Sequence, residues 1–429
     1  MRKRKKKHKE IMKHQPPQGT FIGLNGRQSI TIPDDAKHVF VCGTTGSGKT
    51  VALSNFIKNA VDNDFPALII DGKGDMGKGS MLDIVQRLSH GRKKVYVINL
   101  SDPATSDKYN PFLGASSSMA TDMLINMTEW SEEHYKLNAE RYIQRILQML
   151  LLAKVQLSFD KIITCMKPAK FTDMSNYLLK KELISKEEHV DNLELLKTSG
   201  KVAQSSVARF STIAEGEAGK IFSDDGINIA QALKENAIIL FTLNPMVYPE
   251  LSPAFGRLVL IDSKIAVGEL FHYQIPRTFF IMDEISSYAT TALTDLVNKS
   301  RSANVTCVLA TQSLSDLDRA VDESYKEQII ENCNNYIVLR QNSGVNAEYW
   351  SNILGTRSTL EVTYQLQQKG LDTSETGFGS ARRVREYHYH PDDIKELQTG
   401  KGIFLSRDTG THCRIDIYKP YREEETLCS

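Results

Sequence analysis

The sequence of 429 residues lacks the features of membrane-spanning and secreted proteins. Its longest apolar run, residues 146–153, is interrupted by Gln148 and is much shorter than the roughly 18 residues that a spanning helix requires. No apolar stretch follows the basic N-terminus, so no signal peptide is predicted. The six cysteines include no Cys-x-x-Cys pair and fit neither a zinc site nor a disulfide framework. These absences predict a cytoplasmic protein, with peripheral contact to the inner face of the cell membrane as its closest approach to a bilayer.

Charge is balanced over the whole chain but uneven along it. The formal net charge is +1, from 53 Lys and Arg against 52 Asp and Glu. Residues 1–9 hold seven of the basic residues and no acid, which leaves 46 basic and 52 acidic residues, a net of −6, for the remainder. Such a run attracts nucleic-acid phosphates or anionic lipids, and a solvated terminus without a ligand explains it as well. We expect residues 1–18 to form a disordered basic tail.

Short apolar runs alternate with helical patterns before residue 115 and after residue 220. Runs of about five apolar residues that end in polar or glycine residues are typical of parallel strands covered on both faces. A strand pair around the turn Asn25-Gly26 is expected before them, and three edge strands are expected near the C-terminus. The expected parallel strands lie at residues 38–42, 67–71, 95–99, 237–243, 278–283, 305–310 and 336–340, and the edge strands at 384–389, 402–406 and 413–418.

Residues 115–220 have no strand signal and show helical periodicity instead. Apolar residues recur there at three- and four-residue steps, as in the run from Tyr142 to Leu151. Further helices are expected at 173–183, 187–196 and 201–215. We therefore predict an α/β fold in which residues 19–114 and 221–429 form a doubly wound nucleotide-binding domain and residues 115–220 an inserted all-α domain.

The segment Gly43-Thr44-Thr45-Gly46-Ser47-Gly48-Lys49-Thr50 has the spacing of a complete phosphate-binding loop. It lies between a predicted strand and a predicted helix, which is the setting that the motif needs. The glycines allow backbone N–H groups to surround phosphates, Lys49 is expected to reach the β- and γ-phosphates, and Thr50 to bind Mg²⁺. The sequence therefore predicts a P-loop ATPase with ATP and Mg²⁺ as cofactors.

Polar residues at the ends of two later strands complete this prediction. Asp283 and Glu284 end an apolar strand, where Asp283 is expected to hold Mg²⁺ through water and Glu284 to act as general base. Gln312 ends the next strand and is expected to contact the γ-phosphate. Arg301 is a candidate for stabilising the transition-state charge in the site of a neighbouring subunit. Lys299 could take this role instead, and Arg301 could equally be a surface residue without a catalytic role.

The glycine-rich loop 71–75 also ends a predicted strand, at the edge where ligands of such folds gather. It is expected to line the nucleotide site or to face a DNA channel, unless it is only a solvated turn. Because the chain outside the tail is acidic, a DNA channel needs a local basic lining. Candidates for that lining are Lys73, Arg209, Lys299, Arg382 and Arg383.

Taken together, these motifs resemble the type IV secretion coupling proteins, the TraG/TraD group of conjugative DNA-transfer ATPases, which are related to the HerA and FtsK motors. The matching segments are residues 43–50, 67–75, 109–112, 279–284, 301–314 and 391–402. The resemblance implies a RecA-like domain with an inserted helical domain for substrate recognition, and a homo-hexameric ring. It also implies the catalytic roles described above for Lys49, Glu284, Gln312 and Arg301.

The resemblance implies DNA as cargo, with a relaxase and the channel proteins as partners. Many members begin with transmembrane helices, whereas this chain begins with the basic tail, so membrane contact is expected through a partner or through that tail. We predict a protein that drives a relaxase-bound single strand into a conjugative secretion channel, with DNA-stimulated ATP hydrolysis. Two alternatives stay open: a HerA- or FtsK-like intracellular DNA pump, and a nucleotide-gated docking platform without motor activity.

Overall fold

The computed structural model describes residues 18–35, 37–130, 132–271, 273, 276–322, 324–369 and 372–422. Apart from Gln18, the predicted basic tail lies outside the described residues. Within them the chain forms an 11-stranded sheet and a separate two-stranded hairpin. No helix in this part of the chain combines the length and apolarity needed to cross a bilayer.

Seven adjacent strands of the large sheet are parallel. Every residue of β3, β4, β6, β7 and β8 is buried, which explains why these strands read as continuous apolar runs. The predicted α/β class with a mostly parallel sheet is therefore confirmed. In spatial order the parallel strands are β9 (Cys333–Val338), β3 (His38–Cys42), β8 (Val305–Thr311), β7 (Thr278–Asp283), β4 (Ala67–Asp71), β6 (Ile238–Thr242) and β5 (Val95–Asn99).

Four antiparallel strands extend the sheet beyond β9, namely β12 (Lys401–Ser406), β13 (Thr411–Ile417), β1 (Gly19–Asn25) and β2 (Gln28–Pro33). The turn predicted between β1 and β2 is present, with Gly26 at a φ of 61°. The prediction that residues 402–406 and 413–418 form edge strands is wrong. Both strands have partners on either side, and β2 is the edge strand on this side of the sheet.

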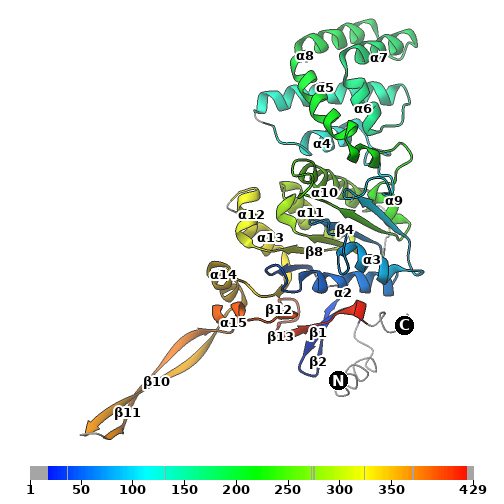
Figure 1. Ribbon diagram of the computed structural model, residues 1–429. Coiled ribbons are helices and arrows are strands. Elements are labelled where there is room, and N and C mark those ends of the chain that lie inside the picture. The colour runs from blue at the N-terminus through cyan, green and yellow to red at the C-terminus, as the bar shows by residue number, and fades with distance from the viewer. Residues whose placement is uncertain are drawn as a thin grey trace.

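The hairpin of β10 (Thr356–Lys369) and β11 (Asp372–Tyr387) projects away from the body of the molecule (Figure 1). The predicted edge strand 384–389 is therefore also wrong, because these residues largely belong to β11, which pairs only with β10. Most described side chains near its base are exposed, including Leu360 and Val362 at 65% and 48%. Leu360, Val362, Tyr364 and Leu366 alternate with polar residues, a pattern typical of a strand, and the sequence analysis overlooked it.

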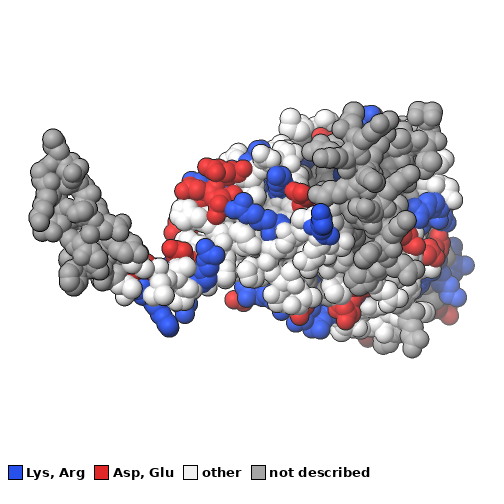
Figure 2. All heavy atoms as spheres, turned by 90° about the horizontal axis from the view of Figure 1, so that it is seen from below, with Lys and Arg blue, Asp and Glu red and all other residues white. Residues whose placement is uncertain are grey.

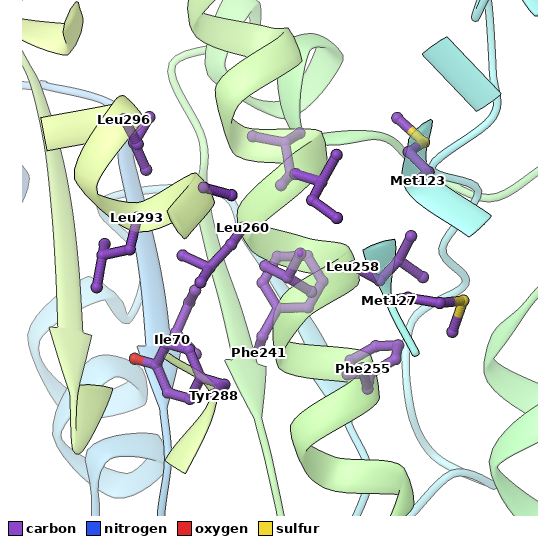
Figure 3. Packing of buried hydrophobic residues seen from close by; sticks show 14 of the residues in the cluster. Ile70, Met123, Met127, Phe241, Phe255, Leu258, Leu260, Tyr288, Leu293 and Leu296 are labelled. Carbon is purple, nitrogen blue, oxygen red and sulfur yellow. The ribbon is translucent and has the colours of Figure 1, made fainter. Parts of the chain in front are cut away.

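Helices cover both faces of the large sheet. Val39 and Val41 point to one face, where α2 (Lys49–Asp62) and α3 (Met81–Ser89) bury their apolar sides. Phe40 points to the other face, which α9 (Ile229–Lys234), α10 (Leu251–Leu270) and α11 (Thr291–Ser300) cover. Figure 3 shows part of this second core, which includes Phe241 of β6, Leu258 of α10 and Met123 of the first inserted helix.

Between β5 and β6 the described chain contains helices and turns. Figure 1 shows these helices, except α9, stacked beyond α10, at the end of the molecule opposite β1 and β2. The prediction of separate helices at 187–196 and 201–215 is wrong, because α8 is continuous over 30 residues and begins at a capping box formed by Ser185 and Glu188. The inserted helices are α4 (Ser117–Asn126), α5 (Glu133–Leu152), α6 (Phe159–Met166), α7 (Pro168–Lys180) and α8 (Lys186–Glu215).

Candidate nucleotide-binding site

The phosphate-binding loop leaves β3 at the carboxyl edge of the sheet and leads directly into α2. Gly46 and Gly48 have φ angles of 74° and 114°, which side chains rarely adopt, so these glycines permit the curl of the loop. The loop is closed by hydrogen bonds from the Thr44 N–H to the Arg340 carbonyl (2.9 Å) and from the Ser47 N–H to the Thr44 carbonyl (3.1 Å). The N-terminus of a 14-residue helix therefore points at the space inside the loop, as anion binding requires.

Lys49 lies folded across this loop and is 4% exposed. Its Nζ donates a hydrogen bond to the Gly43 carbonyl at 2.6 Å. An ammonium group has three donors, so the remaining N–H groups are available for phosphate oxygens. Burial and the nearby Lys73 ammonium lower the pKa of Lys49, and the carboxylates of Asp283 and Glu284 act in the opposite direction.

Asp283 and Glu284 occupy the end of β7, two strands away from β3. One oxygen of Asp283 accepts the Glu284 N–H (3.0 Å), and the side chain of Glu284 turns toward the next strand because its backbone is left-handed, with φ 50° and ψ 52°. The Oε1 atom of Glu284 accepts the Ser286 hydroxyl (3.1 Å), whereas Oε2 is buried without a protein partner. An unsatisfied buried carboxylate oxygen fits a place that receives a water molecule.

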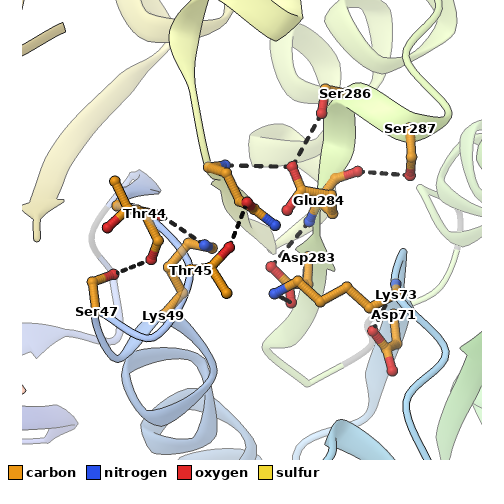
Figure 4. A network of polar contacts seen from close by, with 12 residues as sticks. Thr44, Thr45, Ser47, Lys49, Asp71, Lys73, Asp283, Glu284, Ser286 and Ser287 are labelled. Carbon is orange, nitrogen blue, oxygen red and sulfur yellow. Dashed lines mark hydrogen bonds and ion pairs between the residues drawn. The ribbon is translucent and has the colours of Figure 1, made fainter. Parts of the chain in front are cut away.

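Gln312 connects the two halves of the site. Its backbone N–H points to Glu284 Oε1 at 3.4 Å, and its side-chain oxygen accepts the Thr45 hydroxyl at 2.8 Å. Figure 4 shows this chain of contacts from the phosphate loop to the acidic strand. Hydrogen bonds thus link Glu284 and Gln312, which the sequence placed at two strand ends, to the phosphate loop that precedes Lys49.

The residues fit a magnesium–nucleotide complex. Thr50 lies in the first turn of α2 and is partly exposed, and Asp283 contributes a carboxylate on the neighbouring side. Hard oxygen donors of this kind suit Mg²⁺. No group of three His, Cys, Asp or Glu side chains in the described residues is arranged to hold a metal alone. Mg²⁺ usually takes one or two protein ligands together with phosphates and water.

Lys73 is a site residue that the sequence did not assign to catalysis. Its Nζ lies 3.2 Å from Asp283 Oδ2, and its backbone N–H donates to Asp71 Oδ1 at 3.1 Å. Burial and the charge of Asp283 raise the pKa of Asp71 to about 7. For Lys73, burial lowers the pKa, but the charge and hydrogen bond of Asp283 outweigh it, so the pKa is raised. Of the readings left open for loop 71–75, the structure therefore favours the nucleotide site.

Thr399 and Gly400, which the sequence analysis did not identify, support the phosphate loop through hydrogen bonds. The Thr399 hydroxyl donates to the Gly46 carbonyl (3.1 Å), and the Gly400 N–H donates to the Ser47 carbonyl (3.0 Å). These residues lie between the short helix α15 (Pro391–Lys395) and β12. The only signal in the sequence was the similarity of residues 391–402 to the coupling proteins.

Arg301 does not join the site of its own chain. It lies exposed in a 3₁₀ turn that precedes β8, at the amino edge of the sheet, where its charge acts on His38 at the start of β3. The phosphate loop and Gln312 lie at the carboxyl edge, roughly 20 Å away across a seven-residue strand. Any contact of Arg301 with a nucleotide must therefore involve another subunit.

The candidate DNA-binding residues do not form one cluster in the described structure. Lys73 belongs to the nucleotide site, Arg209 lies over the Trp130 ring (5.2 Å), and Arg382 pairs with Glu361 in the hairpin (2.9 Å). On the described part of the face shown in Figure 2, Lys and Arg are interspersed with Asp and Glu. The structure of one chain therefore shows no extended basic groove for DNA among these residues.

Comparisons with known proteins agree with the fold. The bacterial conjugative coupling protein TrwB, lacking 70 N-terminal residues and unbound, has a TM-score of 0.67 at 16% identity, over 96% of this chain and 90% of that chain. TrwB in complex with ADP and Mg²⁺ has a TM-score of 0.65 at 17% identity, over 96% and 91% of the two chains. At this identity the likeness concerns the fold, which is RecA-like.

Sequence comparison gives the family. The type 4 coupling protein DotL of Legionella pneumophila is 26% identical over 154 residues, which are 31% of this chain and only 19% of DotL. The model for the TraM recognition site of TraD and TraG matches residues 277–399. The model for type IV secretory system conjugative DNA transfer matches residues 1–217, half of the chain. The chain therefore belongs to the conjugative DNA-transfer family of type IV secretion systems, that is, to the coupling proteins of the TraG/TraD type.

Proposed function

We propose that this protein is an ATP-hydrolysing coupling protein that drives DNA, as a relaxase-bound single strand, into a conjugative type IV secretion channel. The observation that carries the proposal is the hydrogen-bonded network at the carboxyl edge of the sheet. It joins Thr45 of the phosphate loop to Gln312, and Gln312 to Glu284. A turn with only a structural role would not explain why a buried lysine, two acidic residues and a glutamine lie together at this edge of the sheet.

Each side chain has a role that its position supports. Lys49 would bind the β- and γ-phosphates, while Thr50 and Asp283 would hold Mg²⁺, which neutralises phosphate charge when bound. Glu284 would orient and deprotonate the attacking water at its unpaired Oε2. Gln312 touches both the loop and Glu284, so it would respond to the presence of the γ-phosphate.

The remaining assignments concern assembly and cargo. We assign residues 19–114 and 221–429 to the nucleotide-binding domain and the inserted domain 115–220 to recognition of the DNA–relaxase cargo. A homo-hexamer would place Arg301 of one subunit at the site of the next. The basic tail, or a partner protein, would bring the ring to the inner face of the membrane.

Steady-state ATP hydrolysis with and without single- and double-stranded DNA tests the proposal. We expect turnover that DNA stimulates and that Lys49→Ala and Glu284→Gln each lower by at least about 10²-fold, because they remove phosphate binding and water activation respectively. Lys58→Ala is the matched control, since Lys58 lies on the same helix and forms an ion pair with Asp62 (3.0 Å).

Each outcome distinguishes the alternatives. ATP binding without turnover under any condition would contradict the motor and favour the nucleotide-gated docking platform. Turnover that single-stranded DNA leaves unchanged but double-stranded DNA stimulates would favour the intracellular DNA pump. Equal losses in the Lys58 and Lys49 variants would show that the loss reflects folding.

A further inference from the structure

Asp283, the carboxylate expected to face a metal, already has a cation beside it. The Lys73 Nζ lies 3.2 Å from Asp283 Oδ2, and the other carboxylate oxygen accepts the Glu284 N–H. The Asp283 side chain is 2% exposed, while the lysine side chain is 25% exposed. Asp283 therefore loses nearly all contact with water and relies on Lys73 for charge compensation (Figure 4).

The loop that carries Lys73 is held tightly between two strand ends. The Gly72 N–H donates to the Asp283 carbonyl (3.3 Å), and a Cβ at Gly74 would lie 1.5 Å from the Leu243 carbonyl oxygen. The Gly74 carbonyl also accepts the Ser101 hydroxyl (3.1 Å). The backbone of the loop is thus fixed, and the ammonium group can move only by rotation of its own four-carbon stem.

Lys73 largely determines the charge balance around Asp283. The carboxylates of Asp283 and Glu284 lie near the ammonium groups of Lys49 and Lys73. The Lys49 Nζ donates to the Gly43 carbonyl, so Lys73 is the ammonium group that contacts Asp283 directly. A divalent cation and an ammonium group cannot share one carboxylate oxygen cheaply, because they repel each other in a poorly hydrated site.

We propose that Lys73 is a positioning residue that occupies the metal-facing carboxylate of Asp283 until a metal–nucleotide complex displaces it. The inference rests on the proposed ATPase site. In this arrangement Mg²⁺ alone binds poorly, so the metal enters together with the nucleotide. The freed ammonium group then faces the incoming phosphates, whose negative charge replaces that of Asp283 as its partner.

Binding of Mn²⁺, a paramagnetic probe for the Mg²⁺ site, tests this by the loss of the free-ion resonance signal. Without nucleotide, Lys73→Met should bind Mn²⁺ at least tenfold more tightly than the parent protein, because the competing charge is gone. Lys73→Arg keeps the charge and should resemble the parent. Adding Asp283→Asn to Lys73→Met should abolish the gain, and Lys58→Met should produce none.

A second arm with a non-hydrolysable ATP analogue separates this inference from the proposed function. The parent protein should then bind one Mn²⁺ per chain. If it does so while Lys73→Met gains nothing without nucleotide, the displacement of Lys73 is wrong and the nucleotide site stands. If the parent binds no Mn²⁺ with the analogue, the proposed ATPase site itself fails. Unchanged thermal midpoints of the variants would show that they are folded.

Discussion

Glu284 has a left-handed backbone conformation, which residues other than glycine seldom adopt. A left-handed φ of 50° costs a non-glycine residue on the order of 1–3 kcal/mol, and the surrounding contacts have to offset it. The Ser287 hydroxyl donates to the Glu284 carbonyl at 2.8 Å, and the Tyr288 hydroxyl donates to the Asp283 carbonyl at 3.0 Å. These bonds fix the turn that directs the carboxylate away from Asp283 and toward Gln312. The strain thus separates the expected base from the expected metal ligand.

His38 gives a pH-dependent prediction at the scale of one residue. It is 3% exposed, and its Nδ1 accepts the Cys307 N–H at 3.0 Å. Burial lowers its pKa from 6.5 to about 4. Between these values the unfolded chain binds more protons than the folded chain. The free energy of unfolding should therefore fall as the pH is lowered through this window, by up to about 1.4 kcal/mol per pH unit.

His38→Asn keeps an acceptor for the Cys307 N–H but cannot be protonated. Its stability relative to the parent protein should rise steadily from pH 6.5 to pH 4.5, as measured by thermal midpoints at several pH values. His90→Asn, at an exposed position, provides the matched control. A constant difference between the His38 variant and the parent over this range would contradict the prediction.

At the scale of elements, the loop after β4 contains two glycines, Gly74 and Gly77, whose surroundings differ. Gly74 has a φ of 67° and no room for a Cβ, whereas nothing lies within 4 Å of a Cβ at Gly77. Gly74→Ala should therefore lower the free energy of unfolding by about 1–3 kcal/mol and shift the loop so that Lys73 reaches neither Asp283 nor the phosphates, with loss of ATP hydrolysis.

Gly77→Ala, in the same loop, should change neither property. Differential scanning calorimetry and steady-state hydrolysis measure the two effects. Equal behaviour of the two alanine variants would show that the close approach of the loop to Leu243 does not constrain it.

At the scale of the whole molecule, the separation of Arg301 from its own nucleotide site makes assembly testable. Arg301→Ala alone should lower the ATPase rate at least about 10²-fold, because the negative charge of the phosphates in the transition state is no longer stabilised by the guanidinium group. Mixing it with Lys49→Ala should restore part of the activity. The arginine variant keeps its phosphate loop, and the lysine variant supplies Arg301 from a neighbouring subunit.

Lys299→Ala is the control for this experiment, since Lys299 is also exposed and lies at the end of the adjacent helix α11. It should hydrolyse ATP at the parental rate. Mixed samples that stay as inactive as their components would contradict an arginine acting between subunits. Strong loss in Lys299→Ala would transfer the role to that residue.

The sequence by itself determined the parallel sheet and the phosphate loop. Strands buried on both faces must be apolar throughout, and the loop needs a fixed local spacing of glycines, Lys49 and Thr50, so both leave a local signature. The expected residues Glu284 and Gln312 followed from the same rule, because parallel strands end at one edge of the sheet.

Tertiary structure alone decided contacts between distant segments. Lys73 meets Asp283 across 210 residues of chain, and Thr399 meets Gly46 across 353. The positions of β12 and β13 inside the sheet depend on pairing with β1 and β9. The projection of the hairpin β10–β11 away from the body of the molecule is likewise visible only in the structure (Figure 1). Such features arise from packing between elements, and no short window of sequence encodes them.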